Sequence, residues 1–315
     1  MVDASNTVII TDENVFEHHT SKFKNLNTIV IKSGEQFKIQ KTVDSIIQQL
    51  IFFKANRSTI LVGIGGGVVT DITGYVASIF MRGIEFGFVP TTVLGLVDAS
   101  IGGKNGIDVG EFKNMVGTIH QPKFILHDIT FLNTLPEKEW QNGFAEIIKH
   151  TCIGNKKMFQ ELNGRNIKYY RSKKTATSLL IQQNAKQKLK VVADDVFEKG
   201  NRKLLNFGHT LGHAIETPYK LSHGQAIAIG MMFACKISEQ ILRLKETQSV
   251  EKLLQQYGLP TELKFNPKKV LELIIMDKKR VQDEIQFVLL EKIGKAVIQK
   301  ISLNQLEKAL VDFSA

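Results

Sequence analysis

The N-terminal half of the chain alternates short apolar runs with segments of helical periodicity, and this alternation limits the possible folds more than any other feature. Apolar runs occupy residues 8–11, 28–32 and 58–64, and helical patterns follow at 39–54 and 68–80. Strands that alternate with helices are typical of βαβ units and a parallel sheet. The sequence therefore predicts an α/β fold with a Rossmann-like N-terminal domain.

A glycine run, Gly65-Gly66-Gly67, lies between the third apolar run and the next helix. Backbone N–H groups and the helix dipole at such a junction bind phosphate groups. By register the run would begin a GxGxxG fingerprint, but position 70 is Thr70, so by itself it is a weak dinucleotide signal. Asp71 follows in the first helical turn, where it either complements the helix dipole or also meets a ligand.

Residues 86–117 are too rich in glycine for a regular helix, and the stretch is too long for a loop that only connects two elements. Apart from a short strand expected at 90–92, we interpret them as a structured loop, and such loops usually carry function. Lys104 and Lys113 follow flexible or turn-forming residues and are candidates for anion contacts. A further strand is expected over 123–128.

After residue 132 the pattern becomes mainly helical, so we expect one domain at 1–132 and a mainly α-helical one at 133–315. Thr134 and Glu137 have the spacing of a capping box, which predicts a helix start there. Further helices are expected over 175–192 and 224–242, then a strand pair in IQFVLL and KAVIQK and a final amphipathic helix.

Three of the eight histidines lie within fifteen residues of one another. His209 and His213 are four apart, so both rings project from one helix face, and His223 opens the next helix. Two readings exist: helix capping and packing, or a divalent metal bound by neutral imidazoles, which the third histidine favours. Glu146 and Lys149 form either a surface ion pair or a buried carboxylate that needs a cation or metal.

Composition restricts the class of protein further. The chain has 315 residues, of which 43% are hydrophobic and 23% charged. This length and composition are typical of a soluble globular protein with two domains. No apolar run reaches the roughly eighteen residues of a membrane helix. The N-terminus has no basic leader, and the two cysteines, Cys152 and Cys235, lack CxxC spacing. We therefore expect a cytoplasmic protein with free thiols and no membrane partner.

The net charge of +10 permits three interpretations. Residues 165–174, RNIKYYRSKK, mix basic and aromatic residues as single-strand nucleic-acid sites do. No recognised nucleic-acid module accompanies them, so a solvated basic face is the better reading of that segment. Several lysines and arginines in glycine-rich or helix-flanking segments favour an acidic small molecule as ligand, and we expect no nucleic-acid partner.

Several long motifs occur together in one order: GGGVVTD (65–71), MRG (81–83), PTTVLGLVDASIGGKNG (90–106), GFAEIIKH (143–150), LLNFGHTLGHAIE (204–216) and HGQAIAIGM (223–231). With them the chain resembles the 3-dehydroquinate synthase family of sugar phosphate cyclases, from about Ile9 to about Ala296. The resemblance implies a Rossmann-like NAD-binding domain followed by a mainly helical metal- and substrate-binding domain.

The resemblance also implies the cofactors and their residues. A divalent metal, Zn or Co, would be held by Glu146, His209 and His223. The residues implied for NAD are Asp12, Ser33, Gly34, Glu35, Lys38, Gly67, Val68, Val69, Thr70, Asp71, Thr91, Thr92, Lys104, Lys113, Phe131, Leu132, Asn133 and Thr134.

The implied reaction converts 3-deoxy-D-arabino-heptulosonate 7-phosphate, a sugar-acid phosphate, to 3-dehydroquinate and phosphate in the shikimate pathway. Lys149, His213 and Asp98 would be catalytic, with His213 a proton relay and Lys149 an electrostatic or proton-transfer partner. The substrate residues would be Arg82, Asn114, Lys188, Arg202, Asn206 and Lys278. Lys104 would also contact the substrate. Arg82 would reach the active site of a partner subunit, so the resemblance implies a homodimer.

The chain departs from the family pattern in places. The family commonly has Glu where Gln225 stands, a difference that would act on metal affinity, and Thr70 replaces a glycine. The spacing from Glu216 to His223 is shorter, and a segment usual before the first strand is absent, which we expect to affect stability or the dimer edge. The alternatives are a metal- and NAD-dependent alcohol dehydrogenase and a sibling cyclase whose substrate has no carboxylate.

Overall fold

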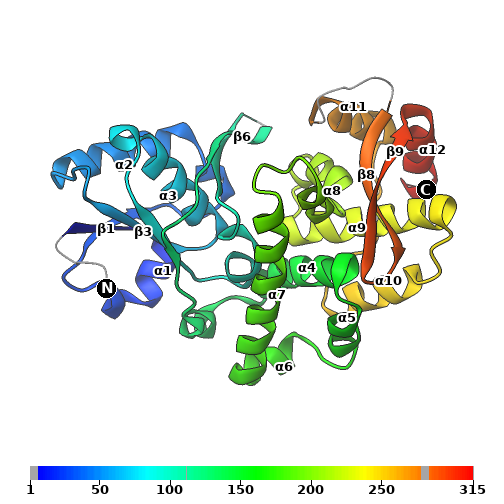
Figure 1. The fold of residues 1–315 in the computed structure, drawn as a ribbon, viewed down its shortest axis with the longest axis horizontal. Helices are drawn as coiled ribbons and strands as arrows, with labels where there is room; N and C mark the ends of the chain where they lie inside the picture. The colour runs from blue at the N-terminus through cyan, green and yellow to red at the C-terminus, as the bar shows by residue number, and fades with distance from the viewer. Residues whose placement is uncertain (1–5, 111, 278–283, 315) are drawn as a thin grey trace. The chain divides into compact units, whose positions relative to one another are not determined.

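The computed structural model describes residues 6–110, 112–277 and 284–314. The chain forms two compact units: one contains residues up to Glu139 and the segment Thr177–Leu189, and the other contains Trp140–Ala176 and Lys190 onward (Figure 1). The second unit is mainly helical. The domain division expected at 132/133 stays a prediction.

The first unit is built on a five-stranded sheet in the order β2-β1-β3-β4-β7, and every neighbouring pair is parallel. The predicted α/β fold with a parallel sheet is thus confirmed. The strands are β1 (Thr7–Asp12), β2 (Asn27–Ile31), β3 (Ile60–Gly65), β4 (Phe86–Pro90) and β7 (Phe124–Ile125), and the helices are α1 (Glu13–His18), α2 (Gln40–Phe52) and α3 (Gly67–Ile79).

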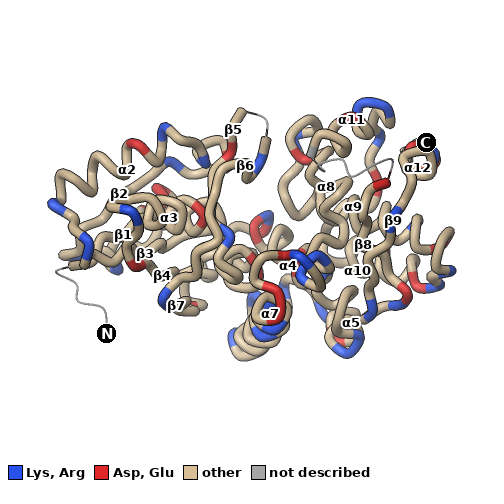
Figure 2. Tube along the Cα trace, turned by 45° about the horizontal axis from the view of Figure 1, so that its top comes forward, with Lys and Arg blue, Asp and Glu red and all other residues tan. Residues whose placement is uncertain are grey.

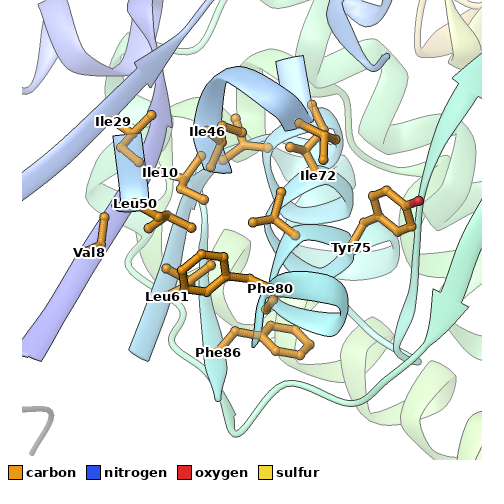
Figure 3. Close-up of a cluster of buried hydrophobic side chains, with 14 of the residues drawn as sticks. Val8, Ile10, Ile29, Ile46, Leu50, Leu61, Ile72, Tyr75, Phe80 and Phe86 are labelled. Carbon is orange, nitrogen blue, oxygen red and sulfur yellow. The ribbon is translucent and has the colours of Figure 1, made fainter. Parts of the chain in front are cut away.

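Successive side chains of a strand point to opposite faces of the sheet, and this alternation creates two cores. On one face, Ile10 and Leu61 pack with Ile46 of α2 and Ile72 of α3 (Figure 3). On the other face, Val62 and Val89 pack with Phe131. Both faces of the sheet are therefore covered, which agrees with the nearly continuous apolar runs of the strands.

The stretch 86–117 differs from the structured loop that the sequence predicts. Its strand ends at Pro90 instead of covering 90–92, and two further strands, β5 (Lys104–Val109) and β6 (Phe112–Ile119), pair in antiparallel fashion. Gly106 and Gly117 face each other in this strand pair. These glycines, predicted to lie in a loop, thus belong to strands. Glycine is suited to these positions because the two backbones approach each other closely.

The second unit contains α4 (Glu137–Gly154) from Trp140 onward and α7 (Lys174–Asp194) outside Thr177–Leu189. Its other elements are α5 (Lys156–Asn163), α6 (Ile167–Ser172), α8 (His209–Glu216), α9 (His223–Leu242), α10 (Thr247–Gln256), α11 (Pro267–Asp277), β8 (Glu284–Lys292), β9 (Lys295–Ser302) and α12 (Leu303–Ser314). The strand pair and the final helix agree with the prediction.

A hairpin of β8 and β9 packs on α9. The backbone N–H of Leu290 donates to Oγ of the buried Ser238, at 3.0 Å, and the rings of Phe233 and Phe287 are 6.2 Å apart. The middle of α9, residues 226–235, is therefore buried, which explains why this part of the helix is apolar. None of the helices in the described ranges is both long enough and apolar enough to cross a membrane.

The capping box at Thr134 is wrong, because the Thr134 hydroxyl lies in a 3-10 turn, where it donates to the carbonyl of Phe131. Cys152 and Cys235 are free thiols, as predicted, and both are fully buried. Burial raises the pKa of the Cys152 thiol to about 12. It is therefore a poor nucleophile.

Charged residues are distributed over both units, with basic and acidic positions interspersed along most elements (Figure 2). In the basic segment 165–174, Tyr170 is 1% exposed and packs on Phe144 with ring centroids 5.3 Å apart. The Arg165 guanidinium lies 5.2 Å from the ring centroid of Tyr169. Both tyrosines are thus engaged in contacts within the unit.

Candidate active site

Helix α4 holds a buried ion pair. Glu146 is 0% and Lys149 1% exposed, and Nζ of Lys149 is in direct contact with Oε2 of Glu146. The surface interpretation of this pair is therefore wrong. A carboxylate is removed from water only where cations or hydrogen-bond donors compensate for the lost hydration. The apolar neighbours of Glu146 in GFAEIIKH explain why this face of α4 lies in the interior.

His209 opens α8 with its ring oriented by a backbone carbonyl. Its Nδ1 lies 3.2 Å from the carbonyl oxygen of Phe207, which only accepts hydrogen bonds, so Nδ1 carries the proton. The other nitrogen, Nε2, lies 3.5 Å from Oε1 of Glu146. Burial, and then the neighbouring Lys149 cation, lower the pKa of His209 well below its usual value. The ring is neutral, the form that binds metals.

His223 opens α9 between two carboxylates. Its Nε2 lies 3.1 Å from Oε1 of Glu146, and its Nδ1 lies 3.4 Å from Oε2 of Glu216. Burial lowers the pKa of His223, but the hydrogen bonds to both carboxylates outweigh burial and raise the pKa to about 10. The two carboxylates therefore favour a positive charge beside Nε2, which a proton or a metal ion in its place would supply.

Glu146, His209 and His223 each offer a ligand atom, and these atoms lie within 4.8 Å of one another. Two imidazoles and one carboxylate are a donor set that binds zinc and leaves positions for a substrate. The residues present thus fit a divalent cation. His213 lies beside them, with its ring edge-to-face to that of His209 and centroids 5.2 Å apart.

Glycines bring α8 and α9 close enough for this convergence. Gly208, which precedes α8, has φ +82°, and a Cβ atom on Gly230 of α9 would overlap the carbonyl of Gly208. Only glycine at both positions allows the left-handed backbone and the close approach. The spacing of the two helices, and with it the placement of His209 and His223, depends on this contact.

Gln225, one of the departures noted above, has a structural role. Its side-chain oxygen accepts from the backbone N–H of Ser222 at 3.0 Å, and this contact completes a capping box at the start of α9. A capping box satisfies two otherwise unpaired helix N–H groups. Gln225 therefore secures the helix end that carries His223.

The loop before α8 involves two predicted substrate residues. Arg202, 2% exposed, donates from Nη1 to the carbonyl of Val196 at 2.5 Å. Asn206 donates from Nδ2 to Oε1 of Glu198, also at 2.5 Å. Asp195 closes the loop by accepting backbone N–H groups, including that of Arg202 at 3.1 Å. Both residues thus lie in one ordered loop that leads into His209.

The predicted NAD residues of the first unit gather at one edge of its sheet. Asp12 ends β1, Ser33 follows β2, Gly67 follows β3 and Thr91 follows β4. In open parallel sheets, ligands bind outside the carboxyl ends of the strands, where the strand order reverses. Here the order reverses between β1 and β3, the strands that lead into Asp12 and the glycine run.

Several of these residues hold one another in place. Asp12 caps α1 by accepting the N–H of Val15 at 3.0 Å, and burial raises the pKa of Asp12. Thr70, which stands where the fingerprint has its third glycine, donates from its hydroxyl to the carbonyl of Gly67 at 2.9 Å.

The remaining residues of the predicted NAD set lie in several elements of the first unit. Ser33 donates from its backbone and hydroxyl to Glu13, Lys113 pairs with Glu35 at 3.4 Å, and Thr92 accepts the N–H of Gly95. Gly34 precedes the 3-10 turn Glu35–Phe37, Val68, Val69 and Asp71 lie in the start of α3, Lys104 begins β5, and Phe131, Leu132, Asn133 and Thr134 form a 3-10 turn.

Asp98 and Lys188 are brought together within the first unit. Nζ of Lys188, in the segment of α7 that belongs to this unit, lies 2.8 Å from Oδ1 of Asp98 and 2.7 Å from its backbone oxygen. Asp98 stands on a single π-helical turn, Gly95–Ala99. Such turns are rare and frequently occur at functional sites.

Arg82 and Lys278 are two further predicted substrate residues. Arg82 is exposed after α3, and Met81 and Arg82 have φ of +48° and +68°. Two successive non-glycine residues in the left-handed region are uncommon and mark a strained turn. Lys278 lies outside the described residues.

Sequence reasoning missed two acidic residues with defined contacts. Glu216 orients His223 through the contact with Nδ1. In the sequence it could have been noticed as a carboxylate at the end of α8 that follows the apolar residues Ala214 and Ile215. Asp108 accepts the backbone N–H of Asn114 at 2.7 Å. No pattern pointed to Asp108, because the pairing of β5 with β6 was not expected.

Comparison with known proteins identifies the family. The models of the N-terminal and C-terminal parts of 3-dehydroquinate synthase match residues 28–142 and 143–280. The 3-dehydroquinate synthase of Pyrococcus abyssi (strain GE5 / Orsay) is 40% identical over 276 residues, 87% of this chain and 81% of that protein. The chain belongs to the 3-dehydroquinate synthase family. The motifs that suggested this family, from the glycine run to the last histidine, lie inside the matched ranges.

Solved sugar cyclases share the fold of this 3-dehydroquinate synthase family member. A 2-deoxy-scyllo-inosose synthase, complexed with carbaglucose-6-phosphate, NAD⁺ and Co²⁺, has a TM-score of 0.87 and 25% identity and covers 99% of this chain and 92% of its own. The 2-epi-5-epi-valiolone synthase of Streptomyces hygroscopicus subsp. jinggangensis 5008, with NAD⁺ and Zn²⁺, has a TM-score of 0.89 and 25% identity, with 98% and 91% covered. The higher identity to the dehydroquinate synthase favours that family over the sibling cyclases.

Proposed function

We propose that the protein is a phosphate-eliminating lyase that converts 3-deoxy-D-arabino-heptulosonate 7-phosphate to 3-dehydroquinate and phosphate. The observation that carries the proposal is the convergence of Glu146, His209 and His223 within 4.8 Å in a chain of this family. The elimination of phosphate needs a C–H bond made acidic by an adjacent ketone. Ring opening and an internal aldol step then close the carbocycle.

Two cofactors would supply what side chains lack. NAD⁺ supplies a hydride acceptor that returns the hydride within the turnover, and a divalent cation, Zn²⁺ or Co²⁺, supplies positive charge for adjacent substrate oxygens. Solved relatives that hold NAD⁺ with Co²⁺ or Zn²⁺ support both assignments. Glu146, His209 and His223 would hold the cation, and the residues at the carboxyl edge of the sheet would hold the dinucleotide.

The side chains divide the remaining work. His213, beside the ligand set, would move protons to and from the substrate. The buried ammonium of Lys149 would stabilise negative charge that develops on a substrate oxygen.

Anion recognition falls to further side chains. Lys104, Asn114, Asn206 and Lys278 would bind the phosphate, and Lys188 and Arg202 the carboxylate, for which the planar guanidinium is suited. Asp98, which holds Lys188 in place, would complete the catalytic set. Since the substrate is acidic, the positive net charge of the chain favours its capture.

We also propose a homodimer located in the cytoplasm. The strained turn at Met81 and Arg82 supports the dimer, because backbone strain is retained where a side chain must be presented. In this proposal Arg82 reaches the active site of the partner subunit.

One experiment separates the synthase from a metal- and NAD-dependent dehydrogenase. The protein is incubated with the heptulosonate phosphate, Zn²⁺ or Co²⁺ and substoichiometric NAD⁺. The synthase releases phosphate over many turnovers without accumulating NADH, and a chelator stops the release. Accumulation of NADH in proportion to substrate consumed, with no free phosphate, would overturn the proposal in favour of the dehydrogenase.

A further inference from the structure

Lys38 is a buried lysine that contacts two predicted ligand-binding residues. It is 4% exposed, and its Nζ lies 2.5 Å from Oδ2 of Asp71 in α3 and 2.6 Å from Oδ1 of Asn114 in β6. Burial lowers the pKa of Lys38, but the nearby carboxylates, Asp71 foremost and then Glu35, together outweigh burial and raise the pKa above its ordinary value. The side chain is therefore a fixed, charged donor between α3 and β6.

This contact determines how the Asn114 amide is turned. An ammonium group has three donors and no acceptor, so the atom of Asn114 that faces it must be the amide oxygen. The amide nitrogen, which donates two hydrogen bonds, is then directed elsewhere than at Lys38. Without Lys38 the amide has no such constraint, because its oxygen and nitrogen are alike in size.

The backbone around Lys38 fixes the same region of the β5–β6 pair. The carbonyl of Lys38 accepts the N–H of Asp108 at 2.8 Å, and the carboxylate of Asp108 accepts the N–H of Asn114 at 2.7 Å. Asn114 has φ +54°, a conformation that asparagine tolerates better than most residues. The position of Asn114 and the direction of its amide thus both depend on Lys38.

We infer that Lys38 is a positioning residue for substrate phosphate: by binding Oδ1 of Asn114, it directs the Nδ2 donors of Asn114 toward the phosphate group. The inference rests on the proposed function, in which Asn114 binds phosphate. It assigns to Lys38 a task separate from its expected contact with NAD, and it links the strand edge that holds the dinucleotide to an anion-binding side chain.

A double-mutant cycle at saturating NAD⁺ tests this coupling. The variants are Lys38→Met, Asn114→Ala and the double variant, with Lys123→Met as the matched control, since Lys123 is an exposed lysine paired with Glu85 in the same unit. Each single variant should raise KM for the heptulosonate phosphate, and the inhibition constant of inorganic phosphate, by about tenfold or more. The double variant should be no worse than Asn114→Ala, and the control should match the wild type. Effects of Lys38→Met and Asn114→Ala that multiply would overturn the inference.

A second variant covers the case in which Lys38→Met does not fold. Asn114→Asp keeps an oxygen for Lys38 and removes the NH₂ donors, at an exposed position that tolerates the change. It should keep the thermal stability of the wild type and bind inorganic phosphate as poorly as Asn114→Ala. Phosphate inhibition at the wild-type level would show that the amide donors are not used, and would overturn the inference.

A measurement independent of turnover separates this inference from the proposed function. In protein labelled with ¹⁵N-asparagine, the NH₂ signals of Asn114, identified by their loss in Asn114→Ala, should shift on addition of inorganic phosphate. The shift should be absent in Lys38→Met. An equal shift in Lys38→Met would overturn the positioning role. If the wild-type protein shows the shift but releases no phosphate from the heptulosonate phosphate, only the proposed reaction is overturned.

Discussion

Nε2 of His223 lies 3.1 Å from Oε1 of Glu146, although the two residues are 77 positions apart in the chain. The contact joins the start of α9 to the middle of α4. A second bond fixes the same crossing, because the N–H of Gly224 donates to Oδ1 of Asn142 at 3.1 Å. Helix α4 thus meets the N-terminal end of α9, where backbone N–H groups have no acceptor within the helix. The predicted metal ligand His223 faces the buried carboxylate of Glu146.

Replacing any one ligand should remove the metal. Glu146→Ala, His209→Ala and His223→Ala should each lose activity and lower zinc affinity by at least about 100-fold, since a zinc site with two protein ligands is incomplete. Metal content after gel filtration, measured by mass spectrometry, checks this, and circular dichroism verifies cooperative unfolding. Full metal content in any one variant would remove that residue from the set.

Glu216 should act on the metal through His223. Glu216→Gln can donate to Nδ1 as well as accept from it, so the ring loses its fixed orientation, and zinc affinity should fall about 10- to 100-fold. The measurement is competition with a chromophoric chelator. Glu239→Gln, which changes a partly exposed glutamate on α9 that pairs with Lys236, is the matched control. Equal zinc affinity in Glu216→Gln and the control would contradict the orienting role.

Arg202 should discriminate substrates by their carboxylate. Arg202→Lys keeps the charge but loses the planar fork, so kcat/KM for the heptulosonate phosphate should fall by about tenfold or more. An analogue without the carboxylate should be affected less. Lys199→Met, which removes a charge from the same loop, serves as the control. Equal losses on both substrates would assign Arg202 to loop structure or phosphate binding.

Gly230→Ala should destabilise the protein and disturb the metal site. The new Cβ overlaps the Gly208 carbonyl, so α8 and α9 must move apart, at a cost of about 1–3 kcal/mol in the free energy of unfolding. Urea denaturation measures this cost, and zinc affinity should fall in parallel. Gly164→Ala, where no atom lies within 4 Å of the added Cβ, should be nearly neutral. Wild-type stability in Gly230→Ala would refute the close-packing account.

Complementation between subunits tests the placement of Arg82. Arg82→Ala and Glu146→Gln should each be inactive as purified proteins. If Arg82 acts on the partner's site, mixed dimers contain one site with both wild-type residues, and co-refolding the two variants should restore part of the activity. Each variant refolded alone is the control. No recovery in dimers shown to be mixed would mean that Arg82 acts within its own subunit or has no role in the reaction.

The sequence alone determined the class of fold and the main chemical groups. Apolar runs that alternate with helical patterns predicted the parallel sheet, because both strand periodicity and helix periodicity are local properties. The motifs predicted the family, which the comparisons confirm. The histidine cluster and the carboxylate of Glu146 were visible as a candidate metal set, since residues of this kind are rare in apolar segments.

Tertiary structure decided what local patterns leave open. The pairing of β5 with β6 went unpredicted because the glycines of these strands are explained by the facing strand, not by their neighbours in sequence. The pairing of Lys38 with Asn114, of Glu216 with His223 and of Gly208 with Gly230 likewise follows from how helices and strands pack. Orientation of an imidazole or an amide depends on which donors and acceptors surround it, and only the folded chain brings those groups within hydrogen-bonding distance.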